Sequence, residues 1–341
     1  MTAHEKPTPD SAGLPLGLDQ ADSDLVKSVT AGLSEVEELL RTCARSDVEF
    51  VDRAAMHLVN AGGKRFRPLF TLLAAHVADG TRPEIITAAA AVELVHMATL
   101  YHDDVMDEAT MRRGAVSANV RWDNTIAILT GDFLFAHASG LVARLGSDAA
   151  RIIAETMSEL VTGQMREAVG PQYTDGAVDH YLTVIDQKTG SLIATSGRFG
   201  GMFSGADLAH VDALYQYGKI IGAAFQISDD IIDIASAASE SGKTPGTDLR
   251  EGVKTLPMLY ALAIGGSGTQ RLRELLEGPI TDDAEVAEAL VLLRDSDGLA
   301  RARETLDDYA KRAKDVLVSL PGGPARDALE SLIRYVIARS G

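Results

Sequence analysis

Apolar residues recur at three- and four-residue spacing along most of this 341-residue chain, and no other feature restricts its fold as strongly. This spacing is the period of an amphipathic helix, and the alternating runs typical of strands are missing. The predicted helices cover residues 24–44, 48–60, 68–79, 83–108, 123–144, 148–169, 177–196, 208–236, 255–264, 282–294, 298–319 and 323–339. Because such helices become stable by burying their apolar sides against one another, the sequence predicts an all-α fold.

The first residues differ in composition from the rest of the chain. Residues 1–22 are rich in proline, glycine and acidic side chains and have no apolar period. A segment of this kind cannot bury a core, which predicts a disordered tail. No later change of composition marks a second domain, so residues 23–341 are predicted to form a single all-α domain, one large helical bundle.

Charge and composition exclude several classes of function. The net charge of -17 repels nucleic-acid backbones and anionic lipids, so no nucleic-acid partner is expected. Cys43 is the only cysteine, and the first residues do not have the pattern of a secretory signal, which together predict a cytoplasmic protein. The longest apolar stretch, residues 85–100, contains Glu93 and His96 and is shorter than a membrane span of about 20 residues. It is predicted to be a buried helix, and no integral membrane segment is expected.

Residues 103–107 read Asp-Asp-Val-Met-Asp inside a predicted helix. Because each helical residue advances by about 100°, Asp103 and Asp107 share a face and Asp104 turns away from it. Like charges placed in this way repel each other unless a cation lies between them. Taken alone, the pattern fits a solvated acidic face equally well.

Asp229, Asp230 and Asp233 repeat this spacing inside a strongly apolar helix. Isoleucine and phenylalanine side chains flank them, which predicts partial burial, and buried carboxylates need partners. Mg²⁺ is the natural partner, because it binds one or two carboxylates and completes its coordination with water and phosphate oxygens. The second cluster therefore favours a metal site over a solvated face.

Residues 62–68, Gly-Gly-Lys-Arg-Phe-Arg-Pro, predict a loop that leads into a helix. Backbone N–H groups, Lys64 and Arg67 can converge there on an anion, and phosphate is the expected one. An ordinary basic turn is the alternative. His96 lies seven residues before Asp103, almost two helical turns, and therefore on the same face. It can donate to a phosphate, or it can be a histidine satisfied within the core.

Five pieces of the sequence occur in the order typical of one enzyme family. They are GGKRFRP at 62–68, DDVMD at 103–107 with Arg112-Arg113-Gly114, Lys188-Thr189, FQISDDIID at 225–233 and GKTPGTDLREGVKTLP at 242–257. On these pieces the chain resembles the trans-isoprenyl diphosphate synthases, also called polyprenyl synthetases, over essentially everything after the tail. The resemblance implies a helical bundle around a central cavity, of the isoprenoid synthase type.

The resemblance also implies roles for individual residues. The ligands of three Mg²⁺ ions would be Asp103, Asp107 and Asp229. Water-mediated contacts to those ions would come from Asp104, Asp230 and Asp233. The side chains that hold the allylic diphosphate together with the ions would be Arg112, Lys188 and Lys243. The isopentenyl diphosphate site would consist of Lys64, Arg67, His96 and Arg113. Thr189 and Gln226 would lie near the reacting carbons.

The implied activity is that of a Mg²⁺-dependent prenyltransferase. The allylic C–O bond of a prenyl diphosphate ionises, and the double bond of isopentenyl diphosphate attacks the cation in a head-to-tail (1'-4) condensation. Preorganised metal ions and arginines would lower the barrier by stabilising the departing negative charge. The released diphosphate can accept the proton that is lost, so no separate side-chain base is required.

A stripe of small residues leads away from the first aspartate cluster. On an ideal helix, Thr99, Ala98, Val95 and Ala91 follow one side of the helix below Asp103. In the family, a bulky ring four or five residues before the first aspartate stops chain growth, and here those positions are Thr99 and Ala98. The resemblance therefore implies an all-trans long-chain product, hexaprenyl to decaprenyl, with a geranylgeranyl product as the alternative.

Two further functions compete with this one. A class I terpene cyclase also ionises a prenyl diphosphate, but it lacks an isopentenyl site, and Lys64, Arg67 and the second aspartate cluster argue against it. A non-catalytic regulatory subunit commonly loses metal aspartates, which this chain keeps. Relatives of this kind usually form homodimers, so a homodimer is expected, with a transient membrane contact during product release.

Overall fold

The computed structural model describes residues 18, 21–171, 176–235, 245–266 and 268–339. Its elements are α1 (Ser23–Ala44), α2 (Glu49–Asn60), α3 (Phe66–Ala75), α4 (Pro83–Met106), β1 (Met111–Arg112), β2 (Ala115–Val116), α5 (Ala118–Arg121), α6 (Asn124–Leu145), α7 (Ser147–Val169), α8 (Ala177–Ile185), the π-helical turn η1 (Asp186–Gly190), α9 (Ser191–Ser204), α10 (Leu208–Ala235), α11 (Thr247–Glu251), α12 (Leu256–Ile264), α13 (Thr269–Leu275), α14 (Asp283–Arg294), α15 (Asp297–Leu317) and α16 (Pro324–Ala338). In the described part of the chain, β1 and β2 are the only strands, paired as a short antiparallel hairpin. The prediction of an all-α fold is confirmed.

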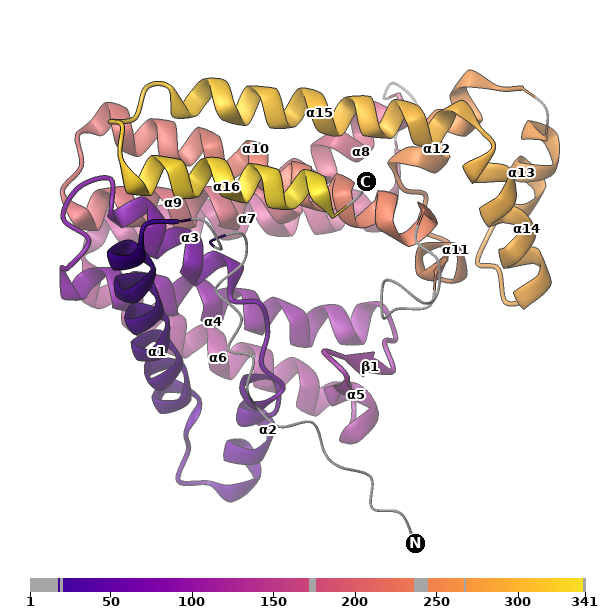
Figure 1. The fold of residues 1–341 in the computed structure, drawn as a ribbon. Coiled ribbons are helices and arrows are strands. Elements are labelled where there is room, and N and C mark those ends of the chain that lie inside the picture. The colour runs from indigo at the N-terminus through magenta and orange to yellow at the C-terminus, as the bar shows by residue number, and fades with distance from the viewer. Residues whose placement is uncertain (1–17, 19–20, 172–175, 236–244, 267, 340–341) are drawn as a thin grey trace, which may run out of the picture.

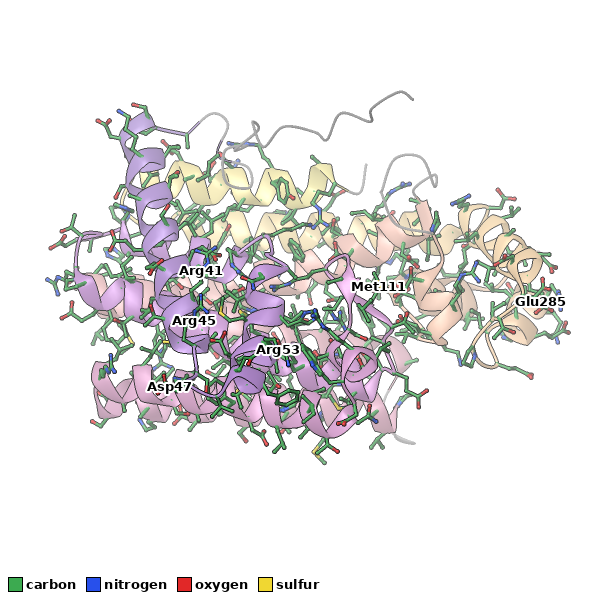
Figure 2. The ribbon with its side chains drawn as sticks, turned by 90° about the horizontal axis from the view of Figure 1, so that it is seen from below. Arg41, Arg45, Asp47, Arg53, Met111 and Glu285 are labelled. Atoms are coloured by element: carbon green, nitrogen blue, oxygen red, sulfur yellow. The ribbon has the colours of Figure 1, made fainter. Side chains whose placement is uncertain are left out.

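The long helices lie roughly along one direction. In Figure 1, α10, α15 and α16 run across the top of the molecule, and α4 and α6 run below them. α1 crosses the left end, while α13 and α14 form the right end. Figure 2, seen from below, places Arg41 of α1 and Arg45, just after that helix, far from Glu285 of α14. The two aspartate clusters lie at the C-terminal ends of α4 and α10.

α4 is the core helix on which the site is built. Its alanine run, residues 88–91, is fully buried, and so are Leu94 and Met97. An apolar helix buried on most sides needs neighbours around it, and α1, α3, α6 and α9 provide them. By length and composition alone, α4 and α6 could each cross a membrane, but most of α4 is buried inside the protein, as in the core helix of a soluble protein. The prediction of a buried helix over residues 85–100 is confirmed.

The helix predicted over residues 177–196 is longer and is interrupted. It consists of α8, η1 and α9, and it continues to Ser204. Glycine normally disfavours a helix, but Gly197 and Gly200 allow α9 to approach its neighbours closely. A Cβ on Gly197 would lie 2.6 Å from the Leu214 carbonyl oxygen, and one on Gly200 would lie 2.4 Å from that of Thr71. The close packing of α9 against α3 and α10 therefore offsets the low helix propensity.

The π-helical turn is held by a partly buried ion cluster. Lys219 of α10 donates to the Asp186 carboxylate at 2.9 Å and to the Asp186 carbonyl oxygen at 3.3 Å. It also forms a short hydrogen bond with Glu159 of α7. A π-helical turn widens the helix and changes the direction of its side chains, and such turns are frequent at functional sites. Here the turn carries Lys188 and Thr189.

Three short helices, α5, α11 and α13, were not predicted from the sequence. α5, α11 and α13 contain four to seven residues, which is too short for a helical period to be recognised. α11 and α13 belong to a separate apolar cluster at the α13–α14 end, which includes Leu249 and Leu272 and reaches the main bundle through Ile234 of α10.

The predicted tail, residues 1–22, lies mostly outside the described residues. Leu18 is fully buried and belongs to the apolar cluster of α3, α10 and α15. The division into a tail and a domain of residues 23–341 stays a prediction.

Candidate active site

A cavity of about 250 Å³ lies among α3, α4, α7, η1, α9 and α10. Its lining combines acids, cations, amides and apolar side chains: Phe66, Arg67, His96, Thr99, Asp103, Leu160, Gln164, Lys188, Thr189, Leu192, Ile193, Phe225, Gln226 and Asp229. Most of the polar members are residues that the sequence singled out. These residues come from four of the elements, α3, α4, η1 and α10. Folding therefore brings together side chains as far apart in the sequence as Arg67 and Asp229, which are separated by 162 positions.

Asp103 is the acid of the first cluster that lines the cavity. His96, seven residues earlier on α4, lines the same cavity, so the predicted shared face is confirmed. Burial raises the pKa of Asp103 to about 6. The positive charge of Lys188 opposes this rise, and the negative charge of Asp107 adds to it. Asp107 is exposed at the C-terminal end of α4. A partly desolvated carboxylate of this kind is stabilised by a nearby cation.

Asp104 has a different environment. It is fully buried, and Arg112 Nε donates to its Oδ1 at 2.6 Å. Its Oδ2 has no hydrogen-bond partner among the described residues. Burial raises the pKa of Asp104, and the hydrogen bond from Arg112 opposes this rise. Asp104 thus anchors Arg112 on β1, and its water-mediated contact with a metal stays a prediction.

Asp229 is the acid of the second cluster that lines the cavity. Arg339, just beyond the end of α16, donates from Nη2 to Asp229 Oδ1 at 2.5 Å. The same guanidinium lies 4.6 Å from the centre of the Phe225 ring, a favourable cation–π distance. Asp229 therefore has a side-chain counter-ion from a residue 110 positions away.

Asp230 is buried behind the cavity wall. Gln226 Nε2 donates to its Oδ1 at 3.1 Å, and the Tyr181 hydroxyl of α8 donates a short hydrogen bond to its Oδ2. Burial raises the pKa of Asp230 to about 7, and the two hydrogen bonds lower it in part. Because Gln226 lines the cavity, Tyr181 and Asp230 fix the orientation of an amide that faces it.

Asp233 continues the second cluster toward the outside of the protein. Its carboxylate accepts from the backbone N–H groups of Thr247 and Asp248, at 3.0 and 3.2 Å, and so fixes the start of α11. Glu251 ends α11, and its pKa is raised by burial and then by the charge of Asp107, with a smaller rise from Asp233. Carboxylates of the two clusters are therefore close enough to influence a common neighbour.

The aspartates suit an ion that is shared with a ligand. Among the described residues, no three His, Cys, Asp or Glu side chains form a group that could hold a metal by themselves. Mg²⁺ seldom uses such a closed protein site, because it keeps several waters and takes oxygens from bound phosphates. Oxygen-only donors on two sides of one cavity, Asp103 on α4 and Asp229 on α10, therefore fit Mg²⁺ bound together with a diphosphate.

The opposite part of the lining is basic. Burial lowers the pKa of Arg67 to about 10, and its Nε has no hydrogen-bond partner within the described ranges. Burial, followed by the charges of Arg67 and Arg113, holds the pKa of His96 well below its usual value, so the imidazole is neutral. Lys64 is exposed, with its Nζ 5.7 Å from the centre of the Phe225 ring. An anion here would meet positive charge and a neutral N–H donor.

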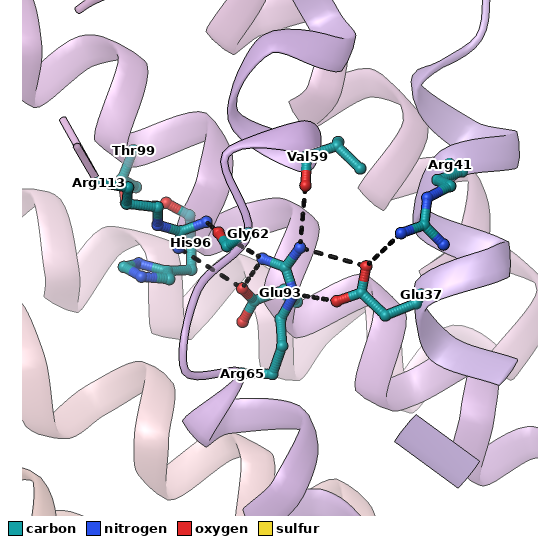
Figure 3. Close-up of polar contacts among 9 residues, drawn as sticks. All are labelled: Glu37, Arg41, Val59, Gly62, Arg65, Glu93, His96, Thr99 and Arg113. Carbon is teal, nitrogen blue, oxygen red and sulfur yellow. Dashed lines mark hydrogen bonds and ion pairs between the residues drawn. The ribbon is translucent and has the colours of Figure 1, made fainter. Parts of the chain in front are cut away.

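Arg113 approaches this basic region from the hairpin. It donates a short hydrogen bond to the Gly62 carbonyl oxygen, and its Nη2 lies 3.7 Å from Glu93 Oε1 (Figure 3). Arg65 donates to the same Glu93 oxygen at 3.0 Å and to Glu37. Arg65 and Arg113 have φ values of 48° and 51°, the left-handed region, which costs a non-glycine residue about 1–2 kcal/mol. The network stabilises two unfavourable backbone conformations.

The predicted chain-length residues differ in their positions. Thr99 lines the cavity, whereas Ala98, Val95 and Ala91 are fully buried and pack in the core. A Cβ on Gly131 would lie 3.0 Å from the Ala98 carbonyl oxygen, so α6 packs tightly on α4 at this level. Tyr101 packs away from the cavity, and its hydroxyl donates to the Ala54 carbonyl oxygen at 2.6 Å. The cavity thus reaches Thr99 without including the rest of the stripe, and the role of the stripe stays a prediction.

Several residues of this region are not found by sequence reasoning: Glu37, Arg65, Glu93, Tyr181, Lys219, Glu251 and Arg339. Glu93 gives the clearest signal, since a lone acid in an apolar helix must have a buried partner. The others reach the site through long-range packing. Lys243, predicted to hold the allylic diphosphate, lies outside the described residues.

Comparisons with known proteins agree with this geometry. A family model described as "Polyprenyl synthetase" matches residues 48–293. The nonaprenyl diphosphate synthase of Mycobacterium tuberculosis is 54% identical over 328 residues, which is 95% of this chain and 97% of that protein. A geranylgeranyl pyrophosphate synthase from Corynebacterium glutamicum, solved with calcium and isoprenyl diphosphate, is 48% identical with a TM-score of 0.85, and 94% of this chain and 98% of that one are covered.

Another solved relative is named for a longer product. A decaprenyl diphosphate synthase from Rhodobacter capsulatus is 33% identical with a TM-score of 0.85, over 93% of this chain and 99% of that one. Relatives with different product names thus share nearly the whole length and fold. With a family match across most of its sequence and these near-full-length likenesses, the chain belongs to the polyprenyl synthetase family and is a prenyltransferase.

Proposed function

We propose that this enzyme condenses isopentenyl diphosphate head-to-tail with an allylic prenyl diphosphate, releases diphosphate and makes an all-trans long-chain polyprenyl diphosphate. The observation that carries the proposal is the cavity lining. Acids for metal ions, Asp103 and Asp229, and a basic group for a second anion, Arg67 with His96, occur in one cavity. Two diphosphates in neighbouring positions are the ligands that this combination accommodates.

We assign the metal ions to Asp103, Asp107 and Asp229, with three Mg²⁺ ions as the expected number. When bound, Mg²⁺ would neutralise the charge that develops on the departing diphosphate. Burial makes the free carboxylate of Asp103 unfavourable, which supports this assignment. Asp229 would exchange Arg339 for an ion as its counter-charge.

The cations of the chain would divide between the two substrates. Lys188, from η1, and Arg112, anchored by Asp104, would bind the allylic diphosphate, and Lys243 is proposed for the same role. The isopentenyl diphosphate would be bound by Lys64, Arg67, His96 and Arg113. Arginine suits phosphate because its planar fork can form two parallel hydrogen bonds.

Ionisation of the allylic C–O bond leaves a carbocation in the cavity. Thr189 and Gln226, which line the cavity, would place oxygen atoms near the developing positive charge. Apolar neighbours such as Leu160, Leu192 and Ile193 would keep water from capturing the cation. The isopentenyl double bond then attacks, a new C–C bond forms, and the released diphosphate accepts the proton lost by the product.

Product length is proposed to lie between hexaprenyl and decaprenyl. The small side chain of Thr99, which lines the cavity, and the nonaprenyl name of the relative from M. tuberculosis support this range. The alternative is a geranylgeranyl product, which the name of the C. glutamicum relative favours.

A homodimer is proposed on the basis of α6. More than half of this apolar helix is not buried within the chain, and Ile128 and Leu129 are 43% and 56% exposed. A second copy that covers this face would remove it from water. Light scattering of the purified protein should give twice the mass of one chain, and a monomeric mass would refute the dimer. The cytoplasm is the proposed location, with a transient membrane contact when the product leaves.

The proposal is tested by a two-substrate assay that measures released diphosphate. Release should require isopentenyl diphosphate, an allylic primer and Mg²⁺ together, and a chelator should abolish it. Release from the allylic substrate alone, with a hydrocarbon product, would indicate a terpene cyclase. No release under any of these conditions would indicate a non-catalytic subunit.

A further inference from the structure

A single buried carboxylate organises the basic end of the cavity. Glu93 is 1% exposed and lies in α4, three residues before His96. Its Oε1 accepts from Arg65 Nη1 at 3.0 Å and lies 3.7 Å from Arg113 Nη2 (Figure 3). The two arginines come from separate segments, the loop before α3 and the turn of the β1–β2 hairpin. Glu93 therefore connects α4 to both loops that would surround isopentenyl diphosphate.

The same contacts fix the backbone of the first loop. Arg65 also donates to the carbonyl oxygens of Gly62 and Val59, each at 3.4 Å, and Arg113 donates to the Gly62 carbonyl oxygen from the other side. A Cβ on Gly63 would lie 2.8 Å from the Arg113 guanidinium carbon, so glycine leaves the space that this side chain occupies. The loop and the guanidinium thus hold each other in one arrangement.

The balance of charge explains why an acid is needed here. Arg65, Arg67 and Arg113 are close enough to affect His96 or one another electrostatically, and each would repel the others. Glu93 opposes that repulsion from the side away from the cavity. Arg67 itself has an Nε without a hydrogen-bond partner among the described residues, and it lines the cavity, where an anion can reach it.

We propose that Glu93 is the positioning residue for isopentenyl diphosphate, because it sets the guanidinium of Arg113 and the 62–67 loop in the geometry that binds this substrate. The inference rests on the proposed function and adds a residue that does not touch substrate. A purely structural salt bridge is the competing explanation, since removal of one partner of any buried pair destabilises a protein. The two explanations differ in what happens to each substrate separately.

The test compares Glu93→Gln with Glu37→Gln. Both variants remove an acid that pairs with Arg65, but only Glu93 contacts Arg113. We expect Glu93→Gln to raise the KM for isopentenyl diphosphate by about tenfold or more, since a small displacement of a binding group can cost up to about 10²-fold. The KM for the allylic primer should change less than about twofold, and Glu37→Gln should leave both values nearly unchanged.

Binding is measured separately from turnover, by calorimetric titration of isopentenyl diphosphate into each full-length protein without Mg²⁺ or primer. Loss of affinity only in Glu93→Gln supports the proposal. Equal affinity in Glu93→Gln and the unmodified protein, or an equal rise of both KM values in the two variants, overturns it. If the unmodified protein itself does not bind isopentenyl diphosphate, the proposed function fails as well, which separates the two failures.

If Glu93→Gln does not fold, the same measurements are made on a second variant, Glu93→Asp. It keeps the charge but shortens the side chain by one methylene, which moves the carboxylate away from Arg113. A rise in the KM for isopentenyl diphosphate with an unchanged primer KM again supports the positioning role. Unchanged values for both substrates would refute it.

Discussion

Asp103→Asn should reduce turnover by roughly 10³-fold while the protein remains folded. Asparagine has the same shape but lacks the charge that would hold a metal ion beside the departing diphosphate. Asp103 is the acid of the first cluster that lines the cavity, so its neighbours cannot replace it from their own positions. The measurement is kcat at saturating Mg²⁺ and both substrates, with circular dichroism to verify the fold.

A matched control is Asp132→Asn on the adjacent helix α6. Asp132 is also an aspartate near α4, where it pairs with His102 at 3.4 Å, but it does not line the cavity. Its replacement should leave kcat within about twofold of the unmodified enzyme. Equal losses in the two variants, or full activity of Asp103→Asn, would contradict the metal role.

The same position predicts a pH effect on the metal-free protein. Burial raises the pKa of Asp103 from 3.8 to about 6, so folding favours the neutral acid. Its stabilising contribution is therefore complete below about pH 4 and is lost as pH rises through 6. Asp103→Asn should remove this dependence, so the metal-free variant should lose less stability between pH 5 and 7 than the unmodified protein. Chemical unfolding at the two pH values measures the difference.

Thr99→Phe should shorten the product. Thr99 lies one helical turn before Asp103 and lines the cavity, so a phenylalanine there would occupy space next to the growing chain. Ala98 is a poorer place for this test, because it is fully buried and a large side chain would overpack the core, typically at a cost of about 1–3 kcal/mol. We expect the main product to fall to geranylgeranyl length or below, as measured by chromatography of the dephosphorylated products.

Thr99→Ser is the control for this substitution. It keeps a small side chain and the hydroxyl that donates to the His96 carbonyl oxygen at 2.8 Å, and it should leave the product length unchanged. An unaltered product distribution in Thr99→Phe, with normal turnover, would mean that another wall determines the length.

Helix geometry within one segment could be predicted from the sequence. The seven-residue spacing of His96 and Asp103 places both on one face of α4, and both line the cavity. The repeated aspartate spacing also predicted a second acidic cluster, and its Asp229 lines the same cavity. These predictions succeed because a regular helix fixes the direction of each side chain from its position alone.

Contacts between distant segments could not be predicted in this way. Arg339 reaches Asp229 across 110 residues, and nothing near either residue indicates the pairing. Arg65 and Arg113 both contact Glu93, and both have a left-handed backbone conformation, which is unfavourable for arginine. The predicted helix over residues 177–196 stops before Gly197 and Gly200, although α9 continues through them. Their close contacts with α3 and α10, which allow this, are visible only in the folded chain.

The depth of the cavity depends on packing in the same way. The sequence identifies small side chains along α4, but Ala98, Val95 and Ala91 are enclosed where α6 packs against them. Small residues permit either an open channel or a close helix contact. The sequence alone cannot decide between these outcomes, and a direct measurement of the product can.

Product length is that measurement. The purified enzyme is incubated with isopentenyl diphosphate, Mg²⁺ and each short allylic primer in turn, and the products are separated by reversed-phase chromatography against all-trans standards. All-trans products between hexaprenyl and decaprenyl are expected, with none formed when Mg²⁺ is removed. Elongation that stops at geranylgeranyl with every primer would contradict the long-chain assignment, and the absence of any condensation product would contradict the proposed prenyltransferase reaction.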